Sequence, residues 1–279
     1  MRVDKTLERV AARTEAEKAR PMYLQLAFVD SHKPFKVPPD ESKAFEREGD
    51  ETAPYRATLH RLDEAVKKLV EGLAAQGLTP ENTIFTIIAD HGEGLDLPPA
   101  HRKQHGFVLY RSTVQIPWLV WGKGIPAGRD VNGLVSQIDF APSIASLAGL
   151  KELGPTDGVD VSGAILGTTE TTRAQAYADT YYDGANRASV WTGTHQCQRD
   201  YGSALVEEDQ FETGCHDRVA DPDFTKTIEQ PELMAALEKQ RAELMQAVPA
   251  PVAEEGKAEK AEKAGKAGKA SKAGKAKAD

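Results

Sequence analysis

Asp90 and His91 are the residues of this 279-residue chain whose types and spacing most clearly suggest chemistry. They follow the uncharged run 83–89, whose β-branched and aromatic side chains predict a buried strand of a parallel sheet. Ligands of open α/β sheets bind at the carboxyl ends of strands, and Gly92 is expected to allow a sharp turn there. A carboxylate beside an imidazole suits Zn²⁺, Mn²⁺ or a similar divalent ion. The alternative is a solvated turn without a ligand, and the dipeptide alone favours neither.

Histidines in neighbouring loops favour the metal site. The apolar run 22–29 predicts a second strand, and the loop that follows it carries His32. His105 lies in the loop after the strand at 83–89, just before a third apolar strand at 115–122. Loops that follow the strands of an α/β sheet converge at one edge, so we expect these histidines to cluster with Asp90 and His91.

The order of these motifs resembles the C-terminal part of a sulfatase of the alkaline phosphatase superfamily. The motifs are His32-x-Pro34-Phe35, Asp90-His91-Gly92-Glu93, His105-Gly106 and the run 116–122 (Ile-Pro-Trp-Leu-Val-Trp-Gly). The segments 136–149 and 217–222 are also similar, so the resemblance spans residues 20–245. It implies an α/β fold with a mainly parallel sheet flanked by helices and a small C-terminal antiparallel subdomain.

The resemblance also implies roles for individual residues. Asp90 and His91 would be ligands of a divalent metal ion, which could be Ca, Mn, Zn or Mg. His32 and His105 would be catalytic, contacting the sulfuryl or phosphoryl group of an anionic ester substrate or its leaving oxygen. Lys33 and Lys103 are further candidates for positive charge. Such a metal ion polarises ester oxygens and activates a nucleophile, while imidazoles donate protons or hydrogen bonds to developing charge.

One part of the family pattern does not occur in this sequence. Sulfatases carry their nucleophile in an N-terminal Cys- or Ser-x-Pro-x-Arg motif, preceded by an acidic pair of metal ligands, and residues 1–31 match neither. We therefore expect a partial protein that is inactive alone and needs a missing N-terminal half. Three functions follow: a sulfatase-like hydrolase of sulfate esters, a phosphoethanolamine- or phosphoglycerol-type transferase of the same superfamily, or a non-catalytic remnant acting as a binding protein.

Charge is distributed unevenly along the chain, whose net charge is −8. From Val252 onward there are eight lysines and five acidic residues, so this tail carries +3 and residues 1–251 carry −11. The acidic body argues against a specific nucleic-acid partner. The low-complexity basic tail is expected to be disordered, either solvated or touching anionic surfaces. No apolar run approaches the roughly 20 residues of a membrane span, and no signal peptide is visible; the resemblance implies a periplasmic or extracytoplasmic, membrane-associated location.

Three regions are expected: a partial sulfatase-like α/β domain at 1–170, a small α+β subdomain at 171–247, and the tail at 248–279. Helices are predicted at 4–19, 55–73, 140–148 and 231–245, with Asp139 as an N-cap. The long loop 30–53 is typical of a lid or binding loop. Short strands are predicted at 176–182, 188–192, 203–207 and 214–219.

Cys197 and Cys215 are the two cysteines of the chain. They bracket a stretch that predicts a hairpin, so paired strands could bring them together in a disulfide, which implies an oxidising compartment. Two free thiols are the alternative, and the sequence leaves both open.

Overall fold

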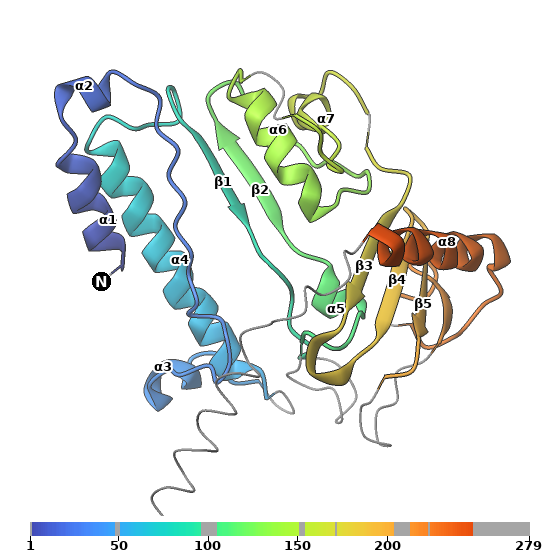
Figure 1. Cartoon of the computed structure of the whole chain (residues 1–279). Coiled ribbons are helices and arrows are strands. Elements are labelled where there is room, and N and C mark those ends of the chain that lie inside the picture. The colour runs from blue at the N-terminus through green and yellow to red at the C-terminus, as the bar shows by residue number, and fades with distance from the viewer. Residues whose placement is uncertain are drawn as a thin grey trace, which may run out of the picture. The chain divides into compact units, whose positions relative to one another are not determined.

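The computed structural model describes residues 2–47, 51–95, 105–150, 154–170, 172–203, 213–222 and 224–247 (Figure 1). Lys103, most of the expected strand at 203–207 and the tail at 248–279 lie outside these ranges. The chain divides into a unit of residues 1–237 and a second unit from residue 238 onward. The expected boundary at residue 170 stays a prediction.

Helices dominate the first half of the described residues, and most of the strands follow in the second half. The helices are α1 (Arg2–Ala11), α2 (Glu15–Lys18), α3 (Pro39–Lys43), α4 (Ala53–Ala74), α5 (Arg111–Val114), η1 (Gln137–Asp139), α6 (Phe140–Leu147), α7 (Ser162–Leu166), η2 (Tyr182–Gly184) and α8 (Pro231–Ala247). The strands are β1 (Ile84–Ile88), β2 (Trp118–Gly122), β3 (Ala176–Thr180), β4 (Arg187–Trp191), β5 (His195–Asp200) and β6 (Gly214–Asp217).

The N-terminal helices form as expected, except that the first is divided. Thr14 caps α2 through a capping box with Glu17, and this separates α2 from α1. Helix α1 packs on α4, where the side chain of Gln76 donates a hydrogen bond of 3.1 Å to the carbonyl of Leu7. The predicted helix at 55–73 is confirmed as α4.

Strands β1 and β2 form an antiparallel pair with Ile84 opposite Gly122 and Ile88 opposite Trp118. The indole of Trp118 donates a hydrogen bond of 3.0 Å to Thr86 across the pair. The mainly parallel sheet is therefore not what we observe: every strand pairing in the described parts of the chain is antiparallel. The reason lies in the expected parallel neighbour of β1, the apolar run at 22–29.

The segment 22–29 is not a strand, which corrects the sequence prediction. Its apolar residues indicated a strand, but Tyr23 is 71% exposed and Val29 is 57% exposed. Within the described ranges, residues 21–28 make no backbone–backbone hydrogen bond. A strand needs a neighbour that offers N–H and C=O groups along its length, and no described segment does so at this place. The edge of β1 opposite β2 is likewise unpaired among the described residues.

The C-terminal strands form an antiparallel sheet in the order β3-β4-β5-β6, which confirms the expected small antiparallel subdomain. Strand β5 was not predicted from the sequence, which placed its third short strand of this region at 203–207. One face of this sheet is apolar and packs with Leu233 and Leu237 from the start of α8. The other face is polar and yet buried; its members are Arg187, Ser189, Gln196, Gln198 and His216.

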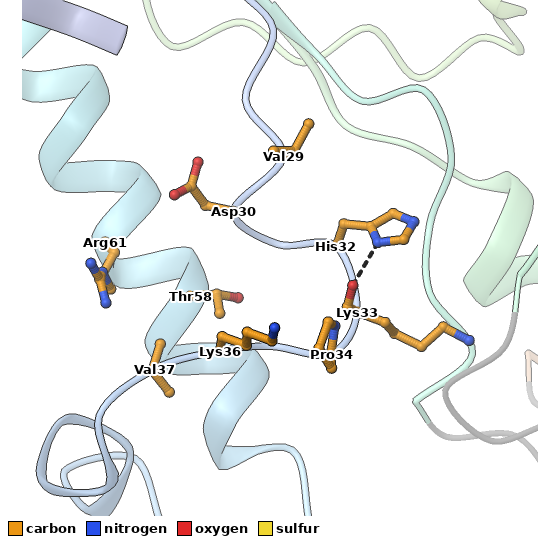
Figure 2. A pocket seen from close by; sticks show the side chains of 9 residues that line it. All are labelled: Val29, Asp30, His32, Lys33, Pro34, Lys36, Val37, Thr58 and Arg61. Carbon is orange, nitrogen blue, oxygen red and sulfur yellow. Dashed lines mark hydrogen bonds between the residues drawn. The ribbon is translucent and has the colours of Figure 1, made fainter. Parts of the chain in front are cut away.

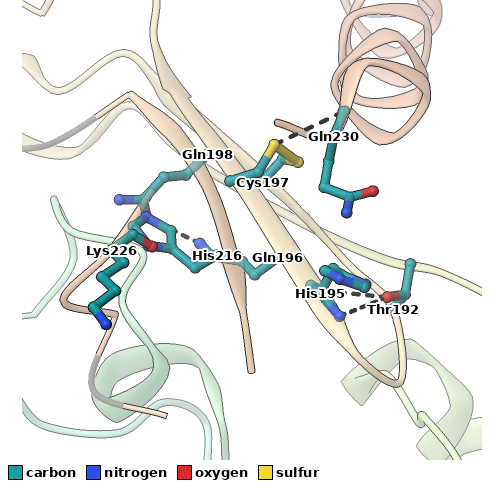
Figure 3. The surroundings of a disulfide bond; sticks show 9 residues. Thr192, His195, Gln196, Cys197, Gln198, His216, Lys226 and Gln230 are labelled. Carbon is teal, nitrogen blue, oxygen red and sulfur yellow. Dashed lines mark hydrogen bonds between the residues drawn. A yellow bond between two sulfur atoms is a disulfide. The ribbon is translucent and has the colours of Figure 1, made fainter. Parts of the chain in front are cut away.

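Cys197 and Cys215 form a disulfide, which confirms the first of the two alternatives. They lie opposite each other on β5 and β6, with 1.96 Å between the sulfur atoms and 4.0 Å between the Cα atoms. Figure 3 shows this bond on one side of the strands and the side chains of Gln196 and His216 on the other.

We expect loss of this disulfide to destabilise the C-terminal sheet. The cross-link joins residues 18 positions apart, and closing a loop of this length in the unfolded chain stabilises the fold by about 3 kcal/mol. Urea unfolding of a variant with both cysteines changed to alanine should show this loss, and reduced wild-type chain should behave alike. Equal midpoints for oxidised wild type and variant would contradict the expectation.

None of the helices in the described residues is long and apolar enough to cross a membrane.

Candidate active site

Asp90 and His91 occupy the turn that follows β1. The backbone N–H of His91 donates to Oδ1 of Asp90 at 3.0 Å, and Oδ2 of Asp90 lies 3.7 Å from Nε2 of His91. The side-chain amide of Gln137 donates to the carbonyls of Ala89 and Asp90, at 3.2 Å each. The turn is thereby fixed from η1, while the carboxylate of Asp90 is 87% exposed and open to a ligand.

Gly92 is required by close packing. A Cβ atom on Gly92 would lie 2.0 Å from the carbonyl oxygen of Ser112. The N–H of Gly92 donates to the carbonyl of Thr113 at 2.8 Å. The sequence predicted a sharp turn at this glycine; the structure shows instead that any larger residue would push the His91 turn away from α5.

The structure brings His32, His91 and His105 together. The rings of His91 and His105 stack with 4.3 Å between their centroids and 22° between their planes. The ring of His32 meets that of His105 edge-on at 5.2 Å. The expected convergence of these residues beside Asp90 is therefore observed, although β1 belongs to an antiparallel pair. We refer to these three residues as the histidine cluster.

Glu93 is a member of this site to which the sequence analysis assigned no role. Its carboxylate oxygens lie 3.2 and 3.1 Å from Nδ1 of His105, and its side chain is only 7% exposed. Burial raises the pKa of Tyr55 on α4 above its ordinary value, and the negative charge of Glu93 raises it further. One feature of the sequence could have identified Glu93 as a site residue: it is a carboxylate two positions after His91, in a loop that holds other candidate site residues.

The donor atoms of Asp90 and His91 fit a divalent ion. Nδ1 of His91 lies 2.7 Å from the carbonyl of Gly92, so this nitrogen donates its proton there and Nε2 keeps its lone pair for a metal. Two ligands that each lie about 2.0–2.4 Å from one ion are roughly 3–4 Å apart, which matches the 3.7 Å between Nε2 and the Asp90 oxygen. No group of three or more His, Cys, Asp or Glu residues that could hold a metal is found within the described ranges, so these two would supply only part of a ligand set.

The loop after His105 is held by the polar face of the C-terminal sheet. Arg187 donates from Nη1 to the carbonyl of Phe107 at 2.7 Å, and Gln196 donates to that of Leu109 at 3.4 Å. Thr180 bonds the carbonyl of Gly106. The sequence did not predict this support, because arginine and glutamine are usually exposed.

Arg187 is itself held by Asp200. Nε of Arg187 lies 2.9 Å from Oδ2 of Asp200, and the arginine side chain is almost completely buried. Burial raises the pKa of Asp200, but hydrogen bonds from Ser203, Arg187 and Gly202 outweigh it and lower this pKa to about 2. The pair therefore stays ionised at neutral pH and keeps the guanidinium aimed at the His105 loop.

A pocket of about 290 Å³ lies beside His32 (Figure 2). It is lined by Val29, Asp30, His32, Lys33, Pro34, Lys36, Val37, Thr58 and Arg61. The lining holds three cationic side chains and one carboxylate, so it carries a net positive charge, and one of the cations, Arg61, also lies 3.7 Å from Glu41 outside the lining. Lys33, a sequence candidate for positive charge, belongs to this lining, and most of the pocket comes from the loop that was expected to bind a ligand or close as a lid.

Asp139 has a structural role, but its carboxylate does not cap α6. It is fully buried and accepts hydrogen bonds from the backbone of Ser136 at 2.8 Å and of Val159 at 2.7 Å. The guanidinium of Arg173 completes its partners at 2.7 Å. Asp139 thereby ties three segments together.

A family model described as Sulfatase matches residues 2–150. The uncharacterized sulfatase YdeN of Escherichia coli K12 is 31% identical over 134 residues, which are 46% of this chain and 24% of YdeN. The chain thus spans about a quarter of the length of this curated relative.

Solved structures extend the similarity beyond residue 150. The structure of yidJ from Bacteroides fragilis, a protein assigned to the sulfatases, covers 86% of this chain with a TM-score of 0.66 at 18% identity, and 56% of yidJ is matched. A second structure, solved in complex with its substrate D-glucosamine-2-N,6-O-disulfate, covers 71% with a TM-score of 0.56 at 23% identity, and 41% of it is matched. These likenesses show that the fold is the α/β fold of sulfatase structures, and that this chain corresponds to part of it.

Proposed function

The chain belongs to the sulfatase family, and we propose that it supplies the metal-binding and anion-contacting part of a hydrolase of sulfate esters. The observation that carries this proposal is the juxtaposition of Asp90 and His91 with His32 and His105. An oxygen and a nitrogen donor stand next to imidazoles that can donate hydrogen bonds to an anion. This combination suits the cleavage of an ester whose product carries negative charge.

Each residue has a distinct role in this proposal. Asp90 and His91 hold a divalent ion, which polarises the ester oxygens when bound. His32 and His105, when doubly protonated, donate hydrogen bonds from Nε2 to the sulfuryl oxygens or to the leaving oxygen, since Nδ1 of each ring is already bonded within the chain. Lys33 and the positive pocket beside His32 attract the anionic ester. A sulfated sugar is our proposed substrate class, because a structure with the same fold holds a disulfated glucosamine.

We propose that the nucleophile comes from a further segment of polypeptide that pairs with this chain. No Cys- or Ser-x-Pro-x-Arg motif occurs in the sequence. The segment 22–29 and the edge of β1 that no described strand covers both offer backbone groups and apolar side chains to such a segment. The disulfide fits an oxidising compartment, such as a location outside the cytoplasm. Free thiols on protein isolated from its native compartment would contradict that location.

Metal titration of the 279-residue chain tests the ligand assignment. We expect calorimetry to show weak binding of Zn²⁺ or Mn²⁺, because two donors are only part of a ligand set, and Asp90→Ala should abolish it. Asp63→Ala is the matched control, since Asp63 is an exposed carboxylate on α4. Binding that survives Asp90→Ala would contradict the proposal.

Ester binding distinguishes sulfate from phosphate chemistry at the same site. With the metal present, an aryl sulfate should shift the imidazole NMR signals of His32 and His105 at lower concentration than the corresponding aryl phosphate. The opposite order would favour the transferase alternative, and no shift with either ester would favour the non-catalytic one.

A further inference from the structure

Glu93 makes contacts that the proposed roles of the other residues do not explain. Its buried carboxylate has two described partners, the N–H of Gly94 at 3.2 Å and Nδ1 of His105. A carboxylate loses much hydration when it is buried, so it must be compensated by a strong donor. Nδ1 of His105 is the only side-chain donor to this carboxylate among the described residues. We therefore expect this contact to fix the orientation of the carboxylate.

The contact determines which nitrogen of His105 carries a proton. Both carboxylate oxygens of Glu93 lie within 3.2 Å of Nδ1, and a carboxylate accepts hydrogen bonds, so we assign the proton between the two groups to Nδ1. In a neutral imidazole the other nitrogen, Nε2, then keeps its lone pair. No described residue forms a hydrogen bond with Nε2 of His105.

The histidine cluster fixes the plane of the same ring. His91 stacks on His105 and His32 meets it edge-on. Glu93 disfavours a flip of the ring about its Cβ–Cγ bond, because the flip would move Nδ1 away from the carboxylate. The neighbouring histidines therefore hold the plane of the ring, and Glu93 determines both its flip state and the nitrogen that carries the proton.

We propose that Glu93 is a positioning residue that holds the proton of His105 on Nδ1 and so leaves Nε2 as the nitrogen open to the ester. In this proposal Glu93 acts through its contact with His105. The inference rests on the proposed function only in naming a sulfate ester as the ligand that contacts Nε2. The tautomer of His105 is a property of the chain without any ligand.

Long-range ¹H–¹⁵N NMR of the full chain tests this directly. In chelator-treated protein at about pH 8.5, where an ordinary imidazole is neutral, His105 should show the Nδ1–H tautomer. In Glu93→Ala the proton should move mainly to Nε2, the tautomer that free imidazole side chains prefer in water. Glu93→Gln should restore part of the Nδ1–H population, because its amide oxygen can still accept. A His105→Gln spectrum identifies the signals.

Controls separate positioning from a loss of folding. Glu71→Ala, an exposed position on α4, should leave the tautomer unchanged, and the backbone amide spectrum shows whether each variant is folded. Wild type with the proton on Nε2, or Glu93→Ala that keeps it on Nδ1, would overturn the inference. Because the measurement needs neither metal nor ester, failure to bind an aryl sulfate with the Nδ1–H tautomer intact would contradict the proposed function alone.

Discussion

The 279-residue chain should show no turnover of aryl sulfate esters by itself, and should gain turnover when it is joined to a segment carrying the nucleophile motif. Nucleophile and base act as a unit, so the lack of one removes about 10⁴- to 10⁶-fold of the rate whatever else remains. A sulfatase nucleophile segment fused ahead of residue 1, or added as a separate polypeptide, provides the comparison. Release of a coloured phenol from its sulfate ester measures the rate.

Variants of the completed enzyme show whether the present chain contributes to catalysis. His91→Ala should abolish the gained activity, because it removes a proposed metal ligand that also stacks on His105. His60→Ala is the matched control: this histidine lies on α4 against Phe45, outside the histidine cluster. Robust metal-dependent turnover by the chain alone would show that the nucleophile is one of its own residues.

Among single substitutions in the C-terminal sheet, Arg187→Ala should lower the free energy of unfolding most. Arg187→Ala leaves Asp200 without its ion-pair partner and the carbonyl of Phe107 without a donor. Breaking a buried pair on one side costs about 3–5 kcal/mol. We expect urea unfolding to show a loss of this size, with a smaller one for Arg187→Lys, which keeps the charge but not the fork of donors.

Arg199→Ala is the control for this variant. Arg199 lies on the same sheet, but it is exposed and its guanidinium lies over the ring of Tyr201 at 5.6 Å. Such a contact contributes about 0.5–1 kcal/mol. Equal losses for the two arginines would mean that the bonds from Arg187 to Asp200 and Phe107 add nothing.

The pH dependence follows from Asp200. Its pKa falls from an ordinary 3.8 to about 2 in the folded chain, so the folded state binds its proton less readily than the unfolded state. The stabilisation is fully present above the unfolded pKa and is lost as the pH falls through about 2. The difference in unfolding free energy between wild type and Asp200→Asn should therefore be constant above about pH 5 and shrink below pH 4. A difference independent of pH would contradict this assignment.

The clustering of these residues could be predicted from the sequence because they stand in short loops next to recognisable elements, while their roles stay predictions. Asp90, His91 and His105 lie within one stretch between two apolar strands, and His32 follows an apolar run. Glu93 could not be assigned, because burial and its distance from His105 decide its role. Arg187 and Gln196 were missed for the same reason: their partners are backbone carbonyls some 80 residues away along the chain.

The parallel sheet illustrates the opposite failure. An apolar run predicts where a strand would be stable if its neighbours were present, but strand formation depends on a partner's backbone. The run 22–29 has the composition of a buried strand and no described partner strand, so it is extended without being paired. The antiparallel pairing of β1 and β2 could not be predicted either, because composition carries little information on the relative direction of two strands.

Residues 21–28 pair with no other strand among the described residues, which has a practical consequence for anyone who produces this polypeptide. An extended apolar segment whose N–H and C=O groups are not paired with another strand can pair with the same segment of another molecule, as exposed sheet edges do in aggregation. Concentration would then limit the lifetime of a purified sample more than temperature does. Lysines introduced at exposed Tyr23 and Val29 would act as gatekeepers against such association. The same lysines would also weaken binding of the proposed nucleophile-carrying segment to this stretch of chain. A change that favours solubility would therefore disfavour assembly.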